Sequence, residues 1–136
     1  MVKEIIHDPF FLSQPSREAS AEDLPVAQDL IDTLRANLDR CVGMAANMIG
    51  QRKRIIAITK GPLVIPMINP RILSASGSYE TEEGCLSLEG VRKTKRFRTI
   101  RLTWQDMRMK AHTETLEGFP AQIVQHEIDH CDGKLI

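Results

Sequence analysis

The chain has 136 residues, of which 42% are hydrophobic and 26% are charged. This length fits one compact domain, and the apolar fraction is large enough to build a core, which argues against a disordered chain. Lysine plus arginine total 18 and aspartate plus glutamate also total 18, so the net charge of zero excludes a general attraction to nucleic acid or to an anionic membrane.

The first element that the sequence predicts is a helix over about residues 20–40, after an irregular arm over residues 1–19 that prolines interrupt. Ser20 begins a segment that resembles the capping box at the start of a helix. The apolar residues that follow recur at helical spacing; they are Leu24, Ala27, Ile31, Leu34 and Leu38. We therefore expect one N-terminal helix with an apolar face.

The middle of the chain is expected to form strands. Residues 43–50 are small and apolar, which favours a tight loop or a short strand. Five further segments have β-branched or alternating side chains and predict extended backbone, namely residues 54–59, 63–68, 80–88, 98–104 and 110–116. We expect Asn69 and Pro70 to close the second of these strands, and the last two to form a hairpin with its turn near Asp106.

A closing helix is predicted from Pro120 to about residue 132, because Gly118 ends the strand before it and proline suits a first helical turn. The order of elements is then helix, several strands, helix, with no internal repeat. This order favours an α+β fold of mostly antiparallel sheets packed around the C-terminal helix, with one N-terminal helix, over a series of βαβ units.

The closing helix carries the most informative motif, in which His126 and His130 lie four residues apart. Side chains at this spacing project from one helical face, so the two imidazoles can bind the same ion. Glu127 lies about a third of a turn away and is placed to accept a proton from a water on that ion. The apolar neighbours Ile123 and Val124 predict an internal helix, where two incidental histidines without partners would be costly. We therefore interpret the motif as a metal site.

A catalytic metal site usually has three protein ligands, and the sequence offers Cys85 as the third. Cys85 follows Gly84, which lets the backbone approach closely. The other cysteines, Cys41 and Cys131, are interpreted as small core residues. Three cysteines without disulfide-scaffold spacing, and no membrane-length apolar run or secretory leader, indicate reduced thiols in a cytoplasmic protein. One thiolate with two neutral imidazoles suits Fe²⁺, Zn²⁺, Ni²⁺ or Co²⁺ rather than Ca²⁺ or Mg²⁺.

Three segments resemble, in the same order, the signature blocks of the peptide deformylase family; they are residues 43–46, 83–87 and 125–130. The resemblance spans essentially the whole chain and implies a single deformylase-like domain over residues 1–136. It also implies a metal-dependent hydrolase that removes the formyl group from the N-formylmethionyl peptides of newly made proteins.

The resemblance assigns roles to residues of this sequence. Cys85, His126 and His130 would bind one divalent transition metal, Fe²⁺ in the cell with Zn²⁺, Ni²⁺ or Co²⁺ as replacements, and Glu127 would be the general acid and base. The backbone N–H of Leu86 would help to hold the developing oxyanion. The residues expected to contact the substrate are Val42, Gly43, Met48 and Gly84.

Met48 stands where the family has a glutamine whose side chain donates a hydrogen bond to the oxyanion. Methionine has no N–H to donate, and loss of one such donor typically lowers turnover by a factor of about 10² to 10³. Asn47 could take its place only if the loop shifted by one residue, and Cys41 stands where the family has a glycine. We therefore expect a slower deformylase or, alternatively, a weakened relative that binds metal or formylated peptide, or acts on another small N-acyl substrate.

Further interpretations stay open. A small zinc protease could use the same histidine helix, although a histidine or an acid would then be expected in place of Cys85. Residues 92–101 contain six basic side chains, which are either a solvated strand edge that discourages aggregation or a transient contact for the ribosome or an acidic partner. Of the methionines, we expect Met44 or Met48 to lie near the substrate cavity. No segment predicts a specific nucleic-acid site or a membrane contact.

Overall fold

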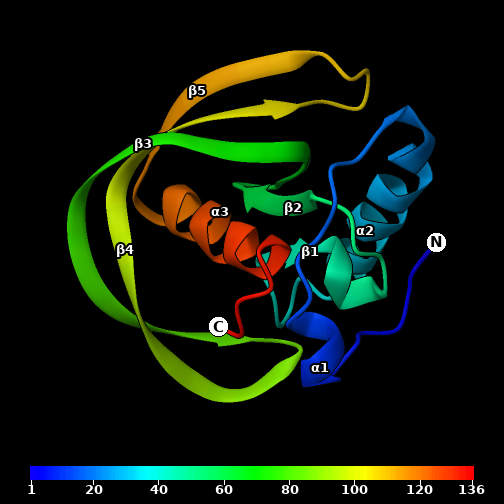
Figure 1. Ribbon diagram of the computed structural model, residues 1–136, viewed down its shortest axis with the longest axis horizontal. Helices are drawn as coiled ribbons and strands as arrows, with labels where there is room; N and C mark the ends of the chain where they lie inside the picture. The colour runs from blue at the N-terminus through cyan, green and yellow to red at the C-terminus, as the bar shows by residue number, and fades with distance from the viewer.

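A five-stranded antiparallel sheet dominates the computed structural model, which describes residues 1–136 (Figure 1). Neighbouring strands of the sheet are consecutive in the chain, so no crossover connection is present. In sheet order the strands are β1 (Gly43–Ala45), β2 (Ile55–Lys60), β3 (Leu63–Cys85), β4 (Leu88–Gln105) and β5 (Ala111–Glu117). This arrangement confirms the predicted α+β fold with antiparallel pairing.

β3 and β4 form a long curved hairpin around the closing helix α3 (Gly118–Cys131), as Figure 1 shows. The prediction that a strand ends at Asn69 and Pro70 is wrong, because β3 continues through both residues to Cys85. The register shifts at this point and Asn69 has a φ of 52°, so the strand bends and the proline stays out of the regular ladder. The predicted segments 63–68 and 80–88 are therefore mostly two parts of one strand.

The predicted hairpin near Asp106 is confirmed, since β4 ends just before Asp106 and β5 follows the turn. One carboxylate oxygen of Asp106 accepts hydrogen bonds from the backbone N–H groups of Arg108 (2.8 Å) and Lys110 (3.0 Å). The other lies 2.7 Å from Nε2 of His112 on β5. The bond to His112, together with the backbone bonds, lowers the pKa of Asp106 to about 2. The ionised carboxylate of Asp106 therefore fixes the turn.

The predicted N-terminal helix is α2 (Leu24–Ala36), which is shorter than expected at both ends. The capping box is present but opens a short 3-10 turn, η1 (Ala21–Asp23): the Ser20 hydroxyl accepts from the N–H of Glu22, and the Asp23 carboxylate accepts from the N–H of Ser20. At the other end, the Asn37 side chain donates to the carbonyl of Thr33 at 2.7 Å. This bond satisfies a terminal carbonyl, and the helix ends before residue 40.

Two short helices were not predicted. In the N-terminal arm, α1 (Pro9–Leu12) begins after Asp8, whose carboxylate accepts from the N–H of Phe10 at 3.0 Å. After β1, residues 46–49 form a 3-10 helix, η2 (Ala46–Ile49). Helices of three or four residues carry no periodic apolar signal in a sequence. None of the helices is long and apolar enough to cross a membrane.

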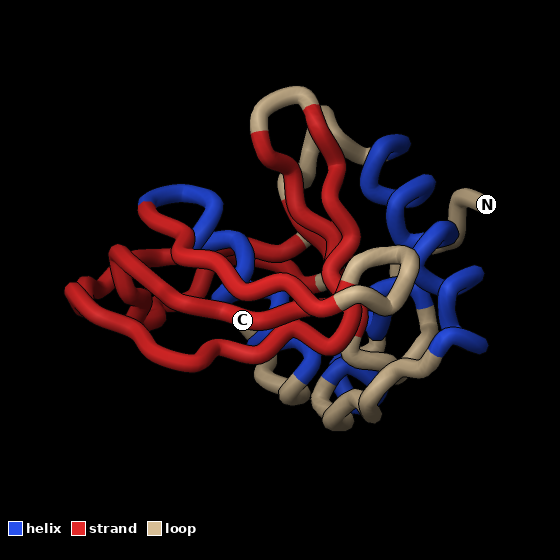
Figure 2. The backbone as a smooth tube through the Cα atoms, turned by 90° about the horizontal axis from the view of Figure 1, so that it is seen from above, coloured by secondary structure: helices blue, strands red, loops and turns tan.

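The apolar core lies on both faces of β2. Ile55 and Ala57 contribute to a cluster that includes α2 and η2, whereas Ile56 and Ile58 contribute to a cluster that includes α3. Alternate side chains of a strand point to opposite faces, so one strand joins the two clusters. Figure 2 shows most of the strands on the left and the N-terminal helices on the right. The strand β2 therefore connects the helix that carries the histidines to the rest of the molecule.

Gln125 attaches α3 to β4 at a point beyond the reach of β5, which pairs only with residues 99–105 of β4. Its side-chain amide accepts from the N–H of Phe97 and donates to the carbonyl of Phe97, both at 2.8 Å. The amide thereby makes the two hydrogen bonds that the backbone of a neighbouring strand would make with Phe97. Because Gln125 directly precedes His126 on α3, this double hydrogen bond also fixes where the two histidines lie along the β3–β4 hairpin.

Candidate metal centre and active site

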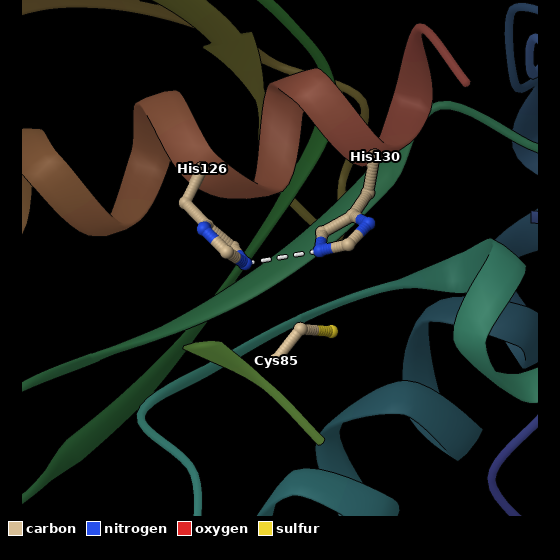
Figure 3. Close-up of side chains that lie close together, drawn as sticks. All are labelled: Cys85, His126 and His130. Carbon is tan, nitrogen blue, oxygen red and sulfur yellow. Dashed lines mark hydrogen bonds between the residues drawn. The ribbon is translucent and has the colours of Figure 1, made fainter. Parts of the chain in front are cut away.

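Cys85, His126 and His130 come together at the end of the long hairpin (Figure 3). Cys85 is the last residue of β3, and the two histidines project from one face of α3. Their ligand atoms lie within 4.8 Å of one another, and the two Nε2 atoms are 3.0 Å apart. Tetrahedral bonds of about 2.0–2.3 Å place the donors of one ion about 3.3–3.8 Å apart, so binding would need the two Nε2 atoms to move slightly apart and the most distant donors to move slightly closer. The three predicted ligands therefore converge.

His126 is oriented by a carboxylate. Its Nδ1 lies 2.7 Å from Oε1 of Glu83, and a carboxylate can only accept, so Nδ1 carries the proton and Nε2 faces the other two donors. Burial lowers the pKa of His126, but hydrogen bonds with Cys85 and Glu83 outweigh it and raise this pKa to about 10. A cation at the three donors would replace the second ring proton. The carboxylate–histidine pair is a common support of metal ligands in proteins.

His130 is ready to act as a neutral ligand. Burial, followed by the charge of His126, lowers the pKa of His130 to about 3. The ring is fully buried, and Nδ1 has no hydrogen-bond partner. A neutral imidazole whose Nε2 accepts from His126 keeps its proton on Nδ1. The donor set of one thiol and two imidazoles, with one ring already neutral, fits a divalent transition metal.

A buried ionic cluster holds the carboxylate behind His126. Arg96 on β4 donates to Glu83 through Nε and Nη2, with the shortest contact at 2.7 Å, and through Nη1 to Asp129 at 2.7 Å. Gln122 donates to the second oxygen of Glu83 at 2.9 Å. Burial would raise the pKa of Glu83, but bonds from His126, Arg96 and Gln122 lower it to about 2. The sequence alone does not indicate this cluster, because Arg96 is one of six basic residues in its segment.

Glu127 lines the same cavity as Cys85 and His126, and one of its carboxylate oxygens is buried without a hydrogen-bond partner. The residue is 4% exposed, and the buried oxygen is Oε1. Burial raises the pKa of Glu127 to about 7, although the charge of His126 opposes the rise. A carboxylate with a pKa near neutrality can both accept and return a proton at physiological pH. Glu127 is therefore suited to the role that the sequence predicts for it.

A cavity of 650 Å³ opens in front of these groups. Eight of the nine predicted site residues line it: Val42, Gly43, Met48, Gly84, Cys85, Leu86, His126 and Glu127. The ninth, His130, is fully buried behind them. The cavity is also lined by side chains that the sequence did not assign to the site, namely Arg40, Cys41, Phe119 and Gln122.

A model of the polypeptide deformylase family matches residues 3–136. The chain belongs to this family. A peptide deformylase of Clostridium beijerinckii is 55% identical over 136 residues, which cover the full length of both chains. The solved peptide deformylase of Thermotoga maritima has a TM-score of 0.88 at 29% identity and covers 99% of this chain and 95% of its own. A class I type b peptide deformylase of Acinetobacter baumannii, solved with Met-Ala-Ser bound, has a TM-score of 0.88 at 27% identity, with coverages of 99% and 97%.

These similarities confirm the resemblance and the fold that the sequence predicts. Members of the peptide deformylase family are hydrolases that use a divalent metal, and the Cys85, His126 and His130 group can hold one in this chain. The interpretation of Cys131 as a core residue is confirmed, since it is 1% exposed. The same interpretation of Cys41 holds only in part: the residue is half-buried against the apolar cluster of α2 and η2, but it also lines the cavity, and its thiol donates to the carbonyl of Gly43 at 2.8 Å.

Met48 and Asn47 point in different directions. Met48 lines the cavity, whereas Met44 is fully buried in the core. The side chain of Asn47 donates to the carbonyls of His130 (3.0 Å) and Leu12 (3.4 Å), on the core side of η2. The loop shift that would turn the side chain of Asn47 toward the cavity therefore does not occur. Of these two residues, Met48 is the one that lines the cavity.

The basic residues 92–101 are partly explained by the sheet. Lys93 and Lys95 lie directly opposite Glu82 and Glu80 on β3. Opposite charges across an antiparallel pair stabilise it, by about 0.2–1 kcal/mol per pair. Arg96 points inward, where it is 4% exposed. These positions favour a structural interpretation of the basic stretch over a nucleic-acid contact.

Gly43 allows β1 to lie against Glu127. A Cβ atom at this position would lie 2.6 Å from Cγ2 of Ile123 and 2.9 Å from Oε2 of Glu127. We expect Gly43→Ala to displace the Glu127 carboxylate and lower the rate of deformylation by about 10²-fold, because such rates are sensitive to displacements of about 1 Å. Formate release measured at equal metal content checks this.

The Gly43→Ala, Ile123→Ala double variant is the matched control, because it relieves the apolar overlap and leaves the overlap with Glu127. Its stability should recover in urea unfolding while its rate stays low. A double variant with the full rate would contradict the role given to Gly43.

Proposed function

We propose that the chain is a metal-dependent amide hydrolase that removes the N-formyl group from formylmethionyl peptides of newly made proteins. The observation that carries this proposal is Glu127, which lines the cavity with Cys85 and His126 and has a buried Oε1 without a hydrogen-bond partner. The Acinetobacter baumannii relative binds Met-Ala-Ser, the peptide that formyl-Met-Ala-Ser becomes when it loses its formyl group.

The proposed metal is one divalent transition ion held by Cys85, His126 and His130, with Fe²⁺ expected in the cell and Zn²⁺, Ni²⁺ or Co²⁺ as alternatives. When bound, such an ion supplies Lewis-acid chemistry to the formyl amide. Glu83 keeps the Nε2 atom of His126 directed at the ion, because it holds the proton of Nδ1.

The other groups act on the peptide. Glu127 takes the proton of the attacking water and delivers it to the leaving nitrogen. The backbone N–H of Leu86 donates to the developing oxyanion, and Gly84 leaves room for it. Val42 and Gly43 lie at β1, which is an edge strand of the sheet and lines the cavity. An extended peptide can add to such an edge through its backbone.

The expected cellular setting follows from this substrate. Formylmethionyl peptides emerge from the ribosome, so we place the enzyme in the cytoplasm with transient ribosome contact. The alternative is a weakened relative that binds metal or formylated peptide, or acts on another small N-acyl substrate. Met48 favours this alternative, because neither it nor the inward-facing Asn47 offers an N–H to the cavity.

The decisive experiment is an anaerobic assay of formyl-Met-Ala-Ser with the protein loaded in turn with Fe²⁺, Ni²⁺, Co²⁺ or Zn²⁺. We expect formate release that depends on the metal and is lost in Glu127→Ala. Formate release that is absent with every metal would refute the proposal. Cleavage of internal bonds in unformylated peptides would support a zinc protease instead.

Met48→Gln is expected to raise kcat by up to about 10²-fold, because glutamine restores an N–H donor to the oxyanion. The measurement is kcat on formyl-Met-Ala-Ser at fixed metal content. Met48→Leu is the matched control, since it keeps an apolar side chain of similar volume and should leave kcat nearly unchanged. If glutamine gives no gain over leucine, another group of this chain already supplies the missing hydrogen bond.

A further inference from the structure

The N-terminal arm joins the two walls of the active site. The backbone N–H of Ile6 donates to the carbonyl of Met48 at 2.8 Å, and Nδ1 of His7 lies 3.0 Å from the carbonyl of Ser87. Met48 belongs to η2, and Ser87 belongs to the turn between β3 and β4. Figure 1 shows the arm and α1 beside the closed end of this hairpin. Two consecutive residues thus contact loops that are far apart in the sequence.

Ser87 is the residue through which the arm reaches the metal ligands. Its N–H donates to Sγ of Cys85 at 3.4 Å, and its carbonyl accepts from His7. The residue is 3% exposed, but its hydroxyl is buried without a partner. The side chain of Ser87 therefore makes no hydrogen bond that could hold the turn. The pairing of Cys85 with Leu88 closes the turn, and within it Ser87 is held by the bond to the ligand sulfur on one side and the bond from His7 on the other.

The contact between His7 and Ser87 has a defined direction. A carbonyl oxygen can only accept, so the Nδ1 atom of His7 carries the proton. The arm itself is anchored, because Ile5 and Ile6 pack against the apolar cluster of α2 and η2. The imidazole is therefore presented to the turn from a fixed backbone, although the side chain lies at the surface.

We propose that His7 is a positioning residue that fixes the turn after Cys85. By holding the carbonyl of Ser87, it keeps the ligand sulfur and the N–H of Leu86 in the orientation that the cavity requires. The role of Leu86 in this inference rests on the proposed function, whereas the effect on the turn does not. His7 lies outside the three sequence blocks that resemble the family, and it is about eighty residues from the turn that it contacts.

The test compares His7→Ala, His7→Asn and His7→Gln. Asparagine places an N–H close to the position of Nδ1, whereas the longer glutamine places it further out. In the metal-free protein, we expect His7→Ala to speed amide hydrogen exchange at Ser87, whose N–H donates to Sγ of Cys85, by about threefold to tenfold, as the loss of one neutral hydrogen bond implies. Asparagine should restore most of the protection and glutamine should not.

With metal bound, kcat of His7→Ala on formyl-Met-Ala-Ser is expected to fall by about threefold to tenfold while KM stays within about twofold. His112→Ala is the matched control, because this surface histidine binds Asp106 at the other hairpin, and it should change neither quantity. If the wild type releases no formate, the proposed function fails while the exchange comparison still stands.

Three outcomes would overturn the inference. Unchanged exchange at Ser87 in His7→Ala would show that the turn does not depend on the arm. Faster exchange throughout α2 as well would show a loss of global stability in place of a local effect. A slower kcat without any change in exchange would show that His7 contacts the substrate directly.

Discussion

Glu127→Gln is expected to lower the rate of formate release by about 10²- to 10⁴-fold, the contribution of a general acid and base. Glutamine has nearly the shape of glutamate, so the cavity and the ligand positions should persist, but its amide cannot take a proton from water. The variant should bind metal as the wild type does, because Glu127 is not one of the three converged donors. The measurements are kcat and metal content.

Stability supplies the second measurement on Glu127→Gln. In the wild type Oε1 is buried without a hydrogen-bond partner, which costs free energy in the folded state. A neutral amide in the same place should leave the free energy of unfolding equal or higher, as is common when a catalytic group is removed. Full activity in this variant, at equal metal content, would assign the proton transfer to another group.

The two histidines could be predicted from the sequence because their convergence is local. Residues four apart on a helix always share a face, whatever the rest of the fold. The third ligand needed more information, since Cys85 lies about forty residues before them and meets them only because the β3–β4 hairpin wraps around α3. The glycine before Cys85 and the resemblance to a family supplied that information.

The residues that hold the ligands in place could not be predicted, because their positions depend on contacts between segments that are far apart in the sequence. Arg96 lies among basic residues that face solvent, and only the register of β4 against β3, together with the packing of α3, makes it point inward. Cysteine is a small residue type that is usually buried, so the sequence favours a core position for Cys41, yet this residue also lines the cavity. The end predicted at Asn69 and Pro70 was wrong because a bend in the middle of a strand and the end of a strand have the same local sequence signal.

Arg96 links the hairpin that carries Cys85 to the helix that carries the histidines, in addition to the bonds of Gln122, Gln125 and His126. Arg96 on β4 binds Glu83 on β3 and Asp129 on α3, so three elements meet at its guanidinium. These contacts neutralise the buried carboxylate of Glu83, which also faces His126, and the half-buried carboxylate of Asp129, which also lies 3.6 Å from Lys134. The arginine therefore acts both on the stability of the fold and on the orientation of His126, which Glu83 holds.

Arg96→Met is expected to lower the free energy of unfolding by about 3–5 kcal/mol, the usual cost when one partner of a buried ion pair is removed. Methionine fills much of the same volume, so most of the loss comes from the two carboxylates that remain. Urea unfolding of the metal-free protein measures it. Lys93→Met is the matched control on the same strand, because Lys93 is exposed and its change should stay within about 1 kcal/mol, the most that its cross-strand pair with Glu82 contributes.

The Arg96→Met variant also separates the stability of the fold from the retention of metal at the site. Glu83 without its arginine should be a weaker anchor for His126, so the variant is expected to lose metal to a chelator faster than the wild type, as happens when outer partners of ligands are removed. Adding Glu83→Gln to Arg96→Met removes one of the two stranded charges and should recover part of the stability. If that double variant is less stable than Arg96→Met alone, the carboxylate of Glu83 is stabilised by His126 and Gln122 without help from Arg96.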